Sequence, residues 1–268
     1  MNISEKAREF HDLHREGLLI LPNAWDAGSA RIVEHAGAKA IATSSAAVAW
    51  AHGYPDGEAI SPEILLATIR EIVRVAGIPV SADIEGGYAQ DPEAAGDFAA
   101  RAIGAGAVGV NIEDGRDAPD LLCAKLERLR RVAAREDVDL WINARVDVYL
   151  RKLAEGEAAH EETISRGRRY AAAGANSIFV PGAVEETLIG NLVREVGRPL
   201  NVLAWPGLPD AAALRALGVR RLSAGAGLAK ASLGRTFELA QNFLRDGRSE
   251  PFGQSALSAS VDAMMKRD

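Results

Sequence analysis

The stretch GAGAVGVNIED, residues 104–114, joins a helix end to a glycine and then to a short apolar run that finishes in two acids. Glycine is the usual residue just past a helix C-terminus, and the β-rich run after it is typical of a strand. The same pattern recurs three more times, in HAGAKAIATSS (35–45), AAGANSIFVPG (172–182) and ALGVRRLSAG (216–225). The chain is therefore expected to repeat a unit of one strand and one helix.

The spacing of the repeats leaves room for further units between them, and IPVSADIEGG and VDLWINARVD fill two of the intervals. Eight strands are predicted, near residues 18–22, 40–44, 79–84, 108–113, 139–145, 177–181, 199–204 and 219–224. Strands that alternate with helices indicate a parallel sheet, and eight units in about 250 residues predict a closed (β/α)8 TIM barrel. An open doubly wound sheet is the alternative, although no GxGxxG or GxxxxGK[ST] motif follows the first strand.

Residues 1–268 are expected to form this one barrel domain. Residues 228–247 are predicted to be the eighth helix, and an extra C-terminal helix is predicted within 254–268. Residues 240–268 would then form a C-terminal helical tail.

Composition excludes several classes of protein. A net charge of −6, with no basic stripe, argues against a nucleic-acid partner. One cysteine, Cys123, rules out an internal disulfide and a CxxC metal site, and fits a reducing compartment. No apolar run approaches the roughly 20 residues that span a bilayer, and the N-terminus is too charged for a signal peptide. A soluble, cytoplasmic protein with no membrane partner is expected.

Each predicted strand has a polar and an apolar face, because side chains alternate along a strand. Ser81, Asp83 and Glu85 share one face, and the apolar residues between them share the other. The apolar faces must pack on the helices, so the polar faces are expected to point into the barrel. Active sites of such barrels lie at the C-terminal ends of the strands. The inward residues expected there are Ser44, Asp83, Glu85, Glu113 and Arg145, with Asn201 opposite.

Three acids and one arginine in one cleft leave an excess of negative charge, which a divalent cation would neutralise. Mg²⁺ suits a site of carboxylates without Cys or His ligands, with Mn²⁺ as the alternative. Other roles stay open: Asp83 as a turn cap, or Glu113 in a buried ion pair with Arg145. Asp114 faces the other way and is expected to cap the next segment.

Other polar residues have simpler interpretations. Asp56 lies in a Pro-Asp-Gly turn and is a site candidate only because that turn follows the second strand. Asp26 is predicted to cap a helix. His52 lies in the same loop as Asp56. Four histidines in charged helical stretches are expected at the surface: His11, His14, His35 and His160.

The segments ATSSAAVAWAHGYPDGE, SADIEGGY, VNIEDG and INARVDVY, in this order and spacing, resemble the isocitrate lyase/phosphoenolpyruvate mutase superfamily. The resemblance covers most of the chain and implies a (β/α)8 barrel, often a homotetramer that exchanges C-terminal helices between subunits. A homo-oligomer, a dimer or a tetramer, is therefore expected, with the tail packed on its own barrel or swapped with a neighbour.

The resemblance also assigns roles to the rim residues. Asp83 matches the principal Mg²⁺ ligand, while Glu85 and Glu113 match acids that hold the metal through water. The resemblance implies that the substrate is bound by Ser44, Ser45, Arg145 and Asn201. It assigns catalysis to Arg145, Asp56 and Ser44, and it assigns the metal to Asp83, Glu85 and Glu113.

One departure from the superfamily matters for function. Its C–C lyases carry a K-[KR]-C-G-H loop after the fourth strand, whose Cys serves as acid and base. Here EDGRDAPDLLCAKLERLRR follows that strand, and Cys123 lies in the wrong context to replace the missing residue. An isocitrate or 2-methylisocitrate lyase is therefore not expected, and the asparagine loop of the phosphonate-type members is not found either.

The resemblance implies a 2-oxo acid bound to Mg²⁺ and a pyruvate-type enolate left when a bond at C3 breaks. The predicted activity is a Mg²⁺-dependent decarboxylase or C–C lyase for an oxaloacetate-like substrate, with His52 or a metal-bound water as proton donor. Two alternatives stay open: P–C cleavage or rearrangement of the phosphonopyruvate type, and a 2-oxo acid-binding protein without catalysis.

Overall fold

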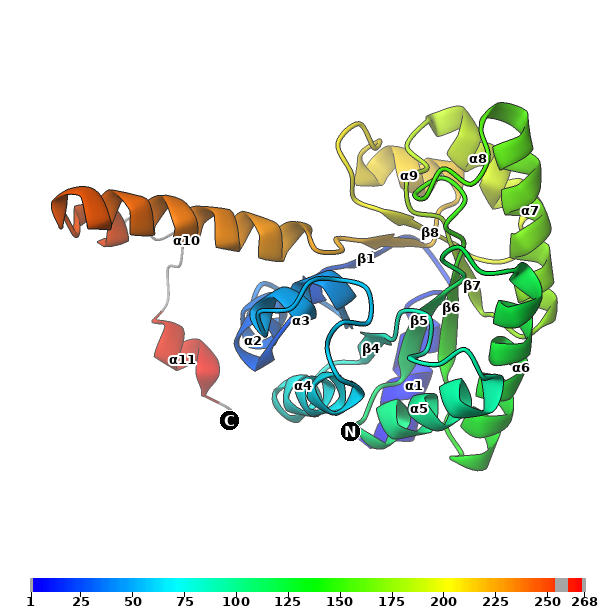
Figure 1. The fold of residues 1–268 in the computed structure, drawn as a ribbon, viewed down its shortest axis with the longest axis horizontal. Helices are drawn as coiled ribbons and strands as arrows, with labels where there is room; N and C mark the ends of the chain where they lie inside the picture. The colour runs from blue at the N-terminus through cyan, green and yellow to red at the C-terminus, as the bar shows by residue number, and fades with distance from the viewer. Residues whose placement is uncertain (1, 254–259, 267–268) are drawn as a thin grey trace.

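A computed structural model gives the structure of the chain and describes residues 2–253 and 260–266. The strands in this part of the chain form one parallel sheet in the order β1-β9-β8-β7-β6-β5-β4-β3-β2. They are β1 (Leu19–Leu21), β2 (Asn23–Ala24), β3 (Ile41–Thr43), β4 (Val80–Asp83), β5 (Gly109–Glu113), β6 (Trp141–Arg145), β7 (Ser177–Phe179), β8 (Leu200–Leu203) and β9 (Arg221–Ser223). The predicted (β/α)8 barrel is confirmed (Figure 1).

The first predicted strand is divided at Pro22 into β1 and β2. Proline has no N–H to donate to a ladder, although its carbonyl still accepts a hydrogen bond from the Ala42 N–H at 3.2 Å. β1 pairs with β9, and β2 pairs with β3. The first strand therefore bonds to the last strand with one half and to the next strand with the other, and this closes the barrel.

The helices are α1 (Ile3–Asp12), α2 (Ala27–His35), α3 (Ser45–Ala51), α4 (Pro62–Val75), α5 (Pro92–Gly104), α6 (Pro119–Arg135), α7 (Gly156–Ala172), α8 (Glu186–Glu195), α9 (Ala211–Leu217), α10 (Gly227–Asp246) and α11 (Val261–Met265), with a 3₁₀ turn η1 (Glu250–Gly253). Their starts follow local sequence. Ser61 and Asp91 cap α4 and α5 immediately before a proline, which is preorganised for the first helical position. The predicted cap Asp26 accepts a hydrogen bond from the Ser29 N–H at 2.6 Å.

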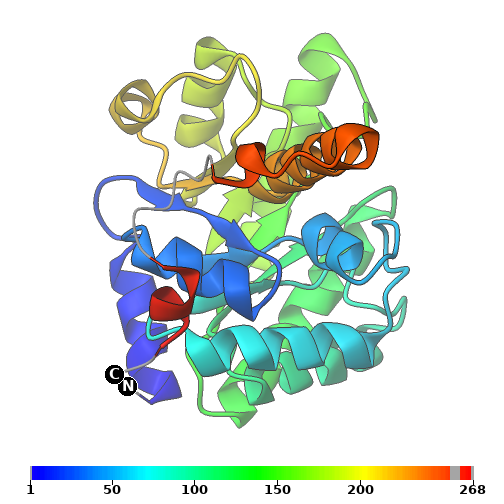
Figure 2. The same ribbon diagram turned by 90° about the vertical axis from the view of Figure 1, so that its left-hand side faces the viewer.

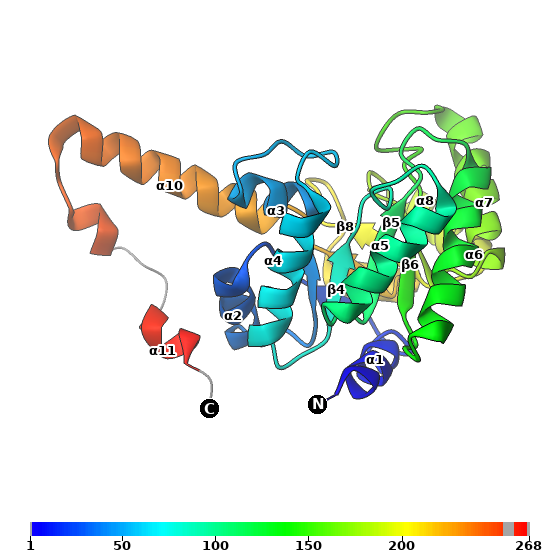
Figure 3. The same ribbon diagram turned by 60° about the horizontal axis from the view of Figure 1, so that its bottom comes forward.

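Apolar strand residues face the helices, as predicted: Val110, Ile112, Ile142 and Ala144 are fully buried. The N-terminal end of the barrel is closed by α1 and the residues after it (Figure 3). A Cβ on Gly109 would lie only 2.7 Å from the ring of Phe10, so this end is tightly filled. The C-terminal ends of the strands stay available for a site.

The prediction of surface histidines was wrong for His14. Its ring stacks on Trp141 with 3.9 Å between centroids, and its Nδ1 is 2.7 Å from the Phe10 carbonyl oxygen. Burial lowers the pKa of His14 to about 3, so the ring is neutral. His14 lies in the turn after α1, and the charged residues around it gave no sign that this turn packs inward. His35 is exposed, whereas His11 and His160 are half-buried.

The predicted eighth helix is present as α10, but it projects away from the barrel (Figures 1 and 3). The predicted tail helix is present as α11, while the other residues of that prediction, 254–259 and 267–268, lie outside the described residues. α11 returns to α2 (Figure 2), where Arg31 donates to the carbonyls of Met264 and Lys266. In the described part of the chain, no helix has both the length and the apolar character needed to cross a membrane.

Candidate active site

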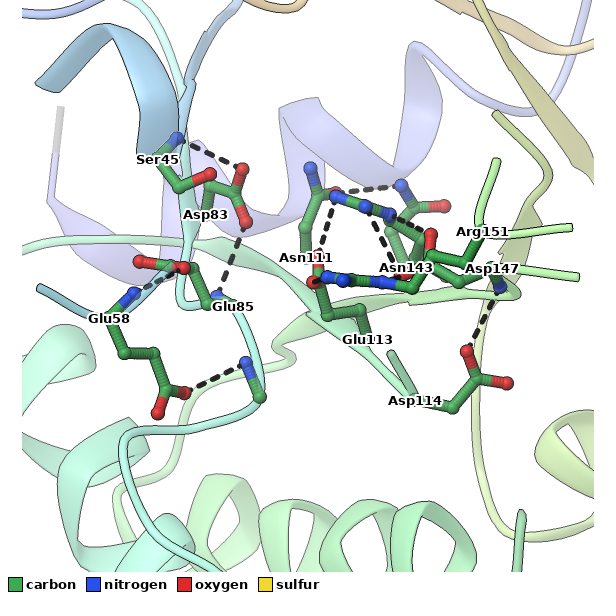
Figure 4. A network of polar contacts seen from close by, with 12 residues as sticks. Ser45, Glu58, Asp83, Glu85, Asn111, Glu113, Asp114, Asn143, Asp147 and Arg151 are labelled. Carbon is green, nitrogen blue, oxygen red and sulfur yellow. Dashed lines mark hydrogen bonds and ion pairs between the residues drawn. The ribbon is translucent and has the colours of Figure 1, made fainter. Parts of the chain in front are cut away.

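Two groups of charged side chains meet at the C-terminal mouth of the barrel (Figure 4). The first group comes from the end of β4 and contains Asp83 and Glu85. The second comes from the ends of β5 and β6 and contains Glu113, Arg145 and two residues of the following loop. The parity argument therefore placed these side chains at one mouth, but the structure separates them into an acidic pair and an ion-paired cluster.

Asp83 and Glu85 are both nearly buried, with 8% and 5% of their surface exposed. Asp83 accepts hydrogen bonds from the Ser45 N–H at 3.1 Å and the Glu85 N–H at 3.3 Å. Glu85 accepts from the Tyr88 hydroxyl at 3.0 Å and the Glu58 N–H at 2.7 Å. Among residues 2–253 and 260–266, therefore, only neutral donors form hydrogen bonds with these two carboxylates.

The Glu85 side chain points toward the mouth for a different reason from the predicted strand alternation. β4 ends at Asp83, and Glu85 has a φ of +49°, in the left-handed region that ordinary residues rarely adopt. The following Gly87 has a φ of +93°, so the chain turns sharply here. Strand alternation does not extend to Glu85, and the turn places its carboxylate beside Asp83 instead.

Sequence reasoning missed Glu58, which fastens the loop after α3 to this turn. Its side chain accepts from the N–H groups of Gly86 at 3.1 Å and Tyr88 at 3.0 Å, and its own N–H donates to Glu85. The only signal for it was its place two residues after Asp56. Through these hydrogen bonds, Glu58 fixes the turn that carries Glu85 and thereby the position of the acidic pair.

The acidic pair fits a cation. Burial raises the pKa of Asp83 despite the nearby Arg145 guanidinium, and burial together with Asp83 raises the pKa of Glu85 to about 7. Two adjacent buried carboxylates without a cationic contact are costly, and a divalent ion would relieve that cost. Among the described residues, no three His, Cys, Asp or Glu side chains are grouped to hold a metal together. Mg²⁺ needs only one or two carboxylates, because it keeps several waters.

Arg145 lies in a closed cluster of two arginines and two acids. Its Nη1 is 2.5 Å from Glu113 and its Nε is 2.7 Å from Asp147. Arg151 contacts the same two acids, with Nη2 at 3.2 Å from Glu113 and Nε at 3.1 Å from Asp147. Each acid therefore bridges both guanidiniums, which fixes the Arg145 side chain at the mouth. Asp147 and Arg151 were missed, although they follow Arg145 by two and six residues.

The alternative reading of Glu113, an ion pair with Arg145, is what the structure shows. Its role as a water-mediated metal ligand stays a prediction. The prediction that Asp114 caps the next segment was wrong, since the N-cap residue of α6 is Ala118 and the helix has no side-chain cap. The buried side chain of Asp114 accepts from Arg166 at 2.9 Å, Tyr170 at 2.7 Å and the Asp147 N–H at 2.9 Å. Asp114 thus ties the loop after β6 to α7.

The remaining predicted residues occupy different positions. Ser44 is the buried N-cap residue of α3, and the Ser45 N–H faces Asp83. Asp56 is exposed in its loop, as the turn interpretation predicted. His52 ends α3 and its Nε2 lies 2.9 Å from the Thr68 hydroxyl on α4. Asn201 is buried on β8, with its Oδ1 accepting from Ser223 at 3.0 Å.

Polar side chains from several strands meet inside the barrel. Asn143 donates to Asn111 at 2.7 Å, and Arg221 donates to Asn111 at 3.2 Å. Because β9 and β5 are not neighbours, the second contact crosses the barrel and confirms that these faces point inward. Arg221, fully buried, was missed. The alternation of side chains along β9 could have indicated it, because Arg221 and Ser223 lie two residues apart and share a face.

The comparison with known proteins agrees with this geometry. The family model described as phosphoenolpyruvate phosphomutase matches residues 10–244. The chain belongs to the phosphoenolpyruvate phosphomutase family. The resemblance to the isocitrate lyase/phosphoenolpyruvate mutase superfamily is thereby confirmed, and this superfamily contains Mg²⁺-dependent lyases and mutases.

Three similar proteins or structures are compared with the chain. An uncharacterised protein of Mycobacterium tuberculosis is 38% identical over 219 residues, which cover 81% of each chain. A solved structure from Burkholderia cenocepacia, described only as a lyase/mutase, is 33% identical and covers 97% of this chain and 95% of its own, with a TM-score of 0.90. Phosphonopyruvate hydrolase, solved with oxalate and Mg²⁺, is 24% identical, covers 98% of this chain and 94% of its own, and has a TM-score of 0.83. The similarity to phosphonopyruvate hydrolase shows a shared fold.

Proposed function

We propose that this protein is a Mg²⁺-dependent decarboxylase or C–C lyase for an oxaloacetate-like 2-oxo acid. The observation that carries the proposal is the buried acidic pair of Asp83 and Glu85 beside the fixed Arg145. In the part of the chain that the structure describes, only neutral donors form hydrogen bonds with this pair. The family contains lyases and mutases, and a structure with the same fold was solved with Mg²⁺ and oxalate, a 2-oxo acid analogue.

Asp83 and Glu85 would hold Mg²⁺, with Mn²⁺ as a substitute. When bound, the metal supplies a Lewis acid for the carbonyl oxygen of the substrate. The hydroxyls of Ser44 and Ser45 would orient the substrate carboxylate, because the Ser45 N–H already donates to Asp83. As the C3–C4 bond breaks, CO₂ leaves and negative charge grows on the carbonyl oxygen, where Arg145 offers a fixed positive charge. A proton added at C3 then gives pyruvate.

A second enzymatic activity has support of its own. The matching family model is described as phosphoenolpyruvate phosphomutase, whose reaction concerns a P–C bond, and the chain lacks the cysteine loop of the C–C lyases. P–C cleavage or rearrangement would use the same metal and the same Arg145, because both reactions leave a pyruvate-type enolate.

A substrate panel separates these functions. The protein is incubated with Mg²⁺ and oxaloacetate, substituted oxaloacetates, phosphonopyruvate or 2-methylisocitrate, and pyruvate, CO₂ and phosphate are followed. We expect pyruvate and CO₂ from an oxaloacetate-like compound, lost with EDTA and restored by Mg²⁺. Phosphate release from phosphonopyruvate would favour the second activity. Absence of turnover together with Mg²⁺-dependent stabilisation by oxalate would instead indicate a binding protein.

The active protein is proposed to be a homo-oligomer that exchanges its C-terminal helix. The projecting helix α10 exposes Leu233, Phe237 and Leu244 by 50%, 64% and 85%. A mainly apolar groove of about 900 Å³ runs over β1 and β9, and Ile20 on its floor is 53% exposed. A helix of a (β/α)8 barrel would cover such a surface, so α10 of a second copy is the fitting occupant.

The oligomeric state tests this arrangement. Light scattering after size exclusion should give a dimer or a tetramer for the wild type, and a Leu233→Glu/Phe237→Glu double variant should be monomeric, because it places charges on the apolar face. Arg235→Glu, on the same helix but in an exposed ion pair, is the matched control and should keep the wild-type mass. A wild type that is monomeric at micromolar concentration would exclude the exchange.

A further inference from the structure

A cavity of about 330 Å³ lies beside the acidic pair and continues the proposed site outward. Its charged lining residues are the cations Arg116, Lys125 and Arg151 and the acids Glu58, Glu85, Glu113, Asp114 and Asp117. The loop after β5, which supplies Arg116, differs from the family lyase pattern in sequence, and Arg151 comes from the loop after β6. A 2-oxo acid held by its head at Asp83 and Glu85 would therefore extend its tail toward these cations.

The side chains of Lys125, Arg151 and Arg116 differ in how many of their N–H donors are already hydrogen-bonded within the protein. Lys125 is nearly buried, and its Nζ donates to the Gly86 carbonyl at 2.7 Å. Arg151 donates through Nε and Nη2 to Asp147 and Glu113, whereas its Nη1 bonds no acceptor within residues 2–253 and 260–266. Arginine has five N–H donors in a planar fork, so part of the fork stays available.

Arg151 is also the most accessible member of its cluster. Its side chain is 39% exposed, compared with 15% for Arg145, 11% for Glu113 and none for Asp147. The turn at Gly115 packs against it, since a Cβ there would lie 3.9 Å from the Arg151 Nε. Arg116 follows in that turn, is exposed, and forms no ion pair with any residue that the structure describes. Two solvent-accessible guanidiniums thus line the cavity.

The geometry points to Arg151, assisted by Arg116, as the group that selects substrates with an anionic tail, a carboxylate or a phosphonate at the end remote from the 2-oxo acid head. This assignment rests on the proposed function. Arg145 faces the reacting end and keeps both acids paired, so Arg151 can share its fork with a substrate oxygen without leaving Glu113 or Asp147 without a cation. Charge-assisted, planar recognition of such oxygens is what arginine does best.

The experiment compares a head-only ligand with tail-bearing ligands. Oxalate binding in the presence of Mg²⁺ is measured by calorimetry, and KM or Ki is measured for oxaloacetate and phosphonopyruvate. For Arg151→Met we expect at least a tenfold rise in KM or Ki for the ligands with anionic tails, and oxalate affinity within threefold of wild type. Arg151→Lys should recover part of the loss, and Arg116→Met should show a smaller rise of the same kind.

The possible outcomes decide between distinct conclusions. A larger loss for oxaloacetate identifies a carboxylate tail, and a larger loss for phosphonopyruvate identifies a phosphonate. If Arg151→Met weakens oxalate as much as the tail-bearing ligands, Arg151 only positions Glu113, and the selective role is overturned. An unchanged KM for every ligand overturns it as well. If wild-type protein binds none of these ligands with Mg²⁺, the proposed function itself fails, and the assignment of Arg151 fails with it.

Discussion

Replacing Asp83 with Asn should abolish Mg²⁺ binding and reduce turnover at least about 10²-fold, because the metal would keep only one of its two proposed carboxylate ligands, Glu85. The amide can still accept the Ser45 N–H, so the fold should persist. Burial raises the pKa of Asp83, which means that the folded metal-free protein disfavours the charged form. The metal-free variant should therefore melt at the same temperature as wild type, or slightly higher.

The change in melting temperature on adding Mg²⁺ gives a direct test of metal binding at Asp83. A ligand present at 100 times its dissociation constant stabilises a protein by about 2.7 kcal/mol, which corresponds to roughly 5–10 °C in melting temperature for a chain of this size. Wild type should show such a shift on adding Mg²⁺, and Asp83→Asn should not. Asp97→Asn, an exposed position on α5, is the matched control and should behave as wild type. An Asp83→Asn protein that keeps both the shift and the activity would refute the metal assignment.

Several residues at the barrel mouth could be predicted from the sequence because side chains alternate between the two faces of a strand. Asp83, Glu113 and Arg145 all lie on or at the end of a strand, where parity alone separates inward from outward. The same rule, applied to β9, would also have found Arg221. Parity was less informative wherever the strand had already ended.

The residues that were missed or misdescribed lie beyond strand ends. Glu85 sits in a left-handed turn, so its direction comes from backbone geometry that a period cannot describe. Asp147 and Arg151 occupy the loop after β6, and their partners are more than 30 residues away in the sequence at Asp114 and Glu113. Such contacts depend on how neighbouring loops meet. The projection of α10 away from the barrel is also not readable from the sequence, because the apolar pattern of a helix does not show which surface the helix packs on.

The second large effect is expected at Arg145. Removing the side chain entirely would leave Glu113 and Asp147 with a single cation, and breaking a buried ion pair commonly costs about 3–5 kcal/mol. Lysine is the more informative substitution, because it keeps the charge and loses the fork that joins the two acids. For Arg145→Lys we expect kcat to fall about 10²–10³-fold, while oxalate affinity in Mg²⁺ falls much less.

This difference between turnover and binding follows from where the charge acts. Arg145 would face the oxygen on which charge grows as the bond breaks, so its fork contributes more to the transition state than to the bound ground state. Steady-state kinetics, oxalate calorimetry and thermal melting are measured on the same preparations, with Arg101→Lys in an exposed ion pair as control. Equal losses in kcat and oxalate affinity would mean that Arg145 binds substrate without stabilising the developing charge. Normal kcat in a folded Arg145→Lys protein would place the reacting oxygen elsewhere in the mouth, away from the cluster of Glu113 and Asp147.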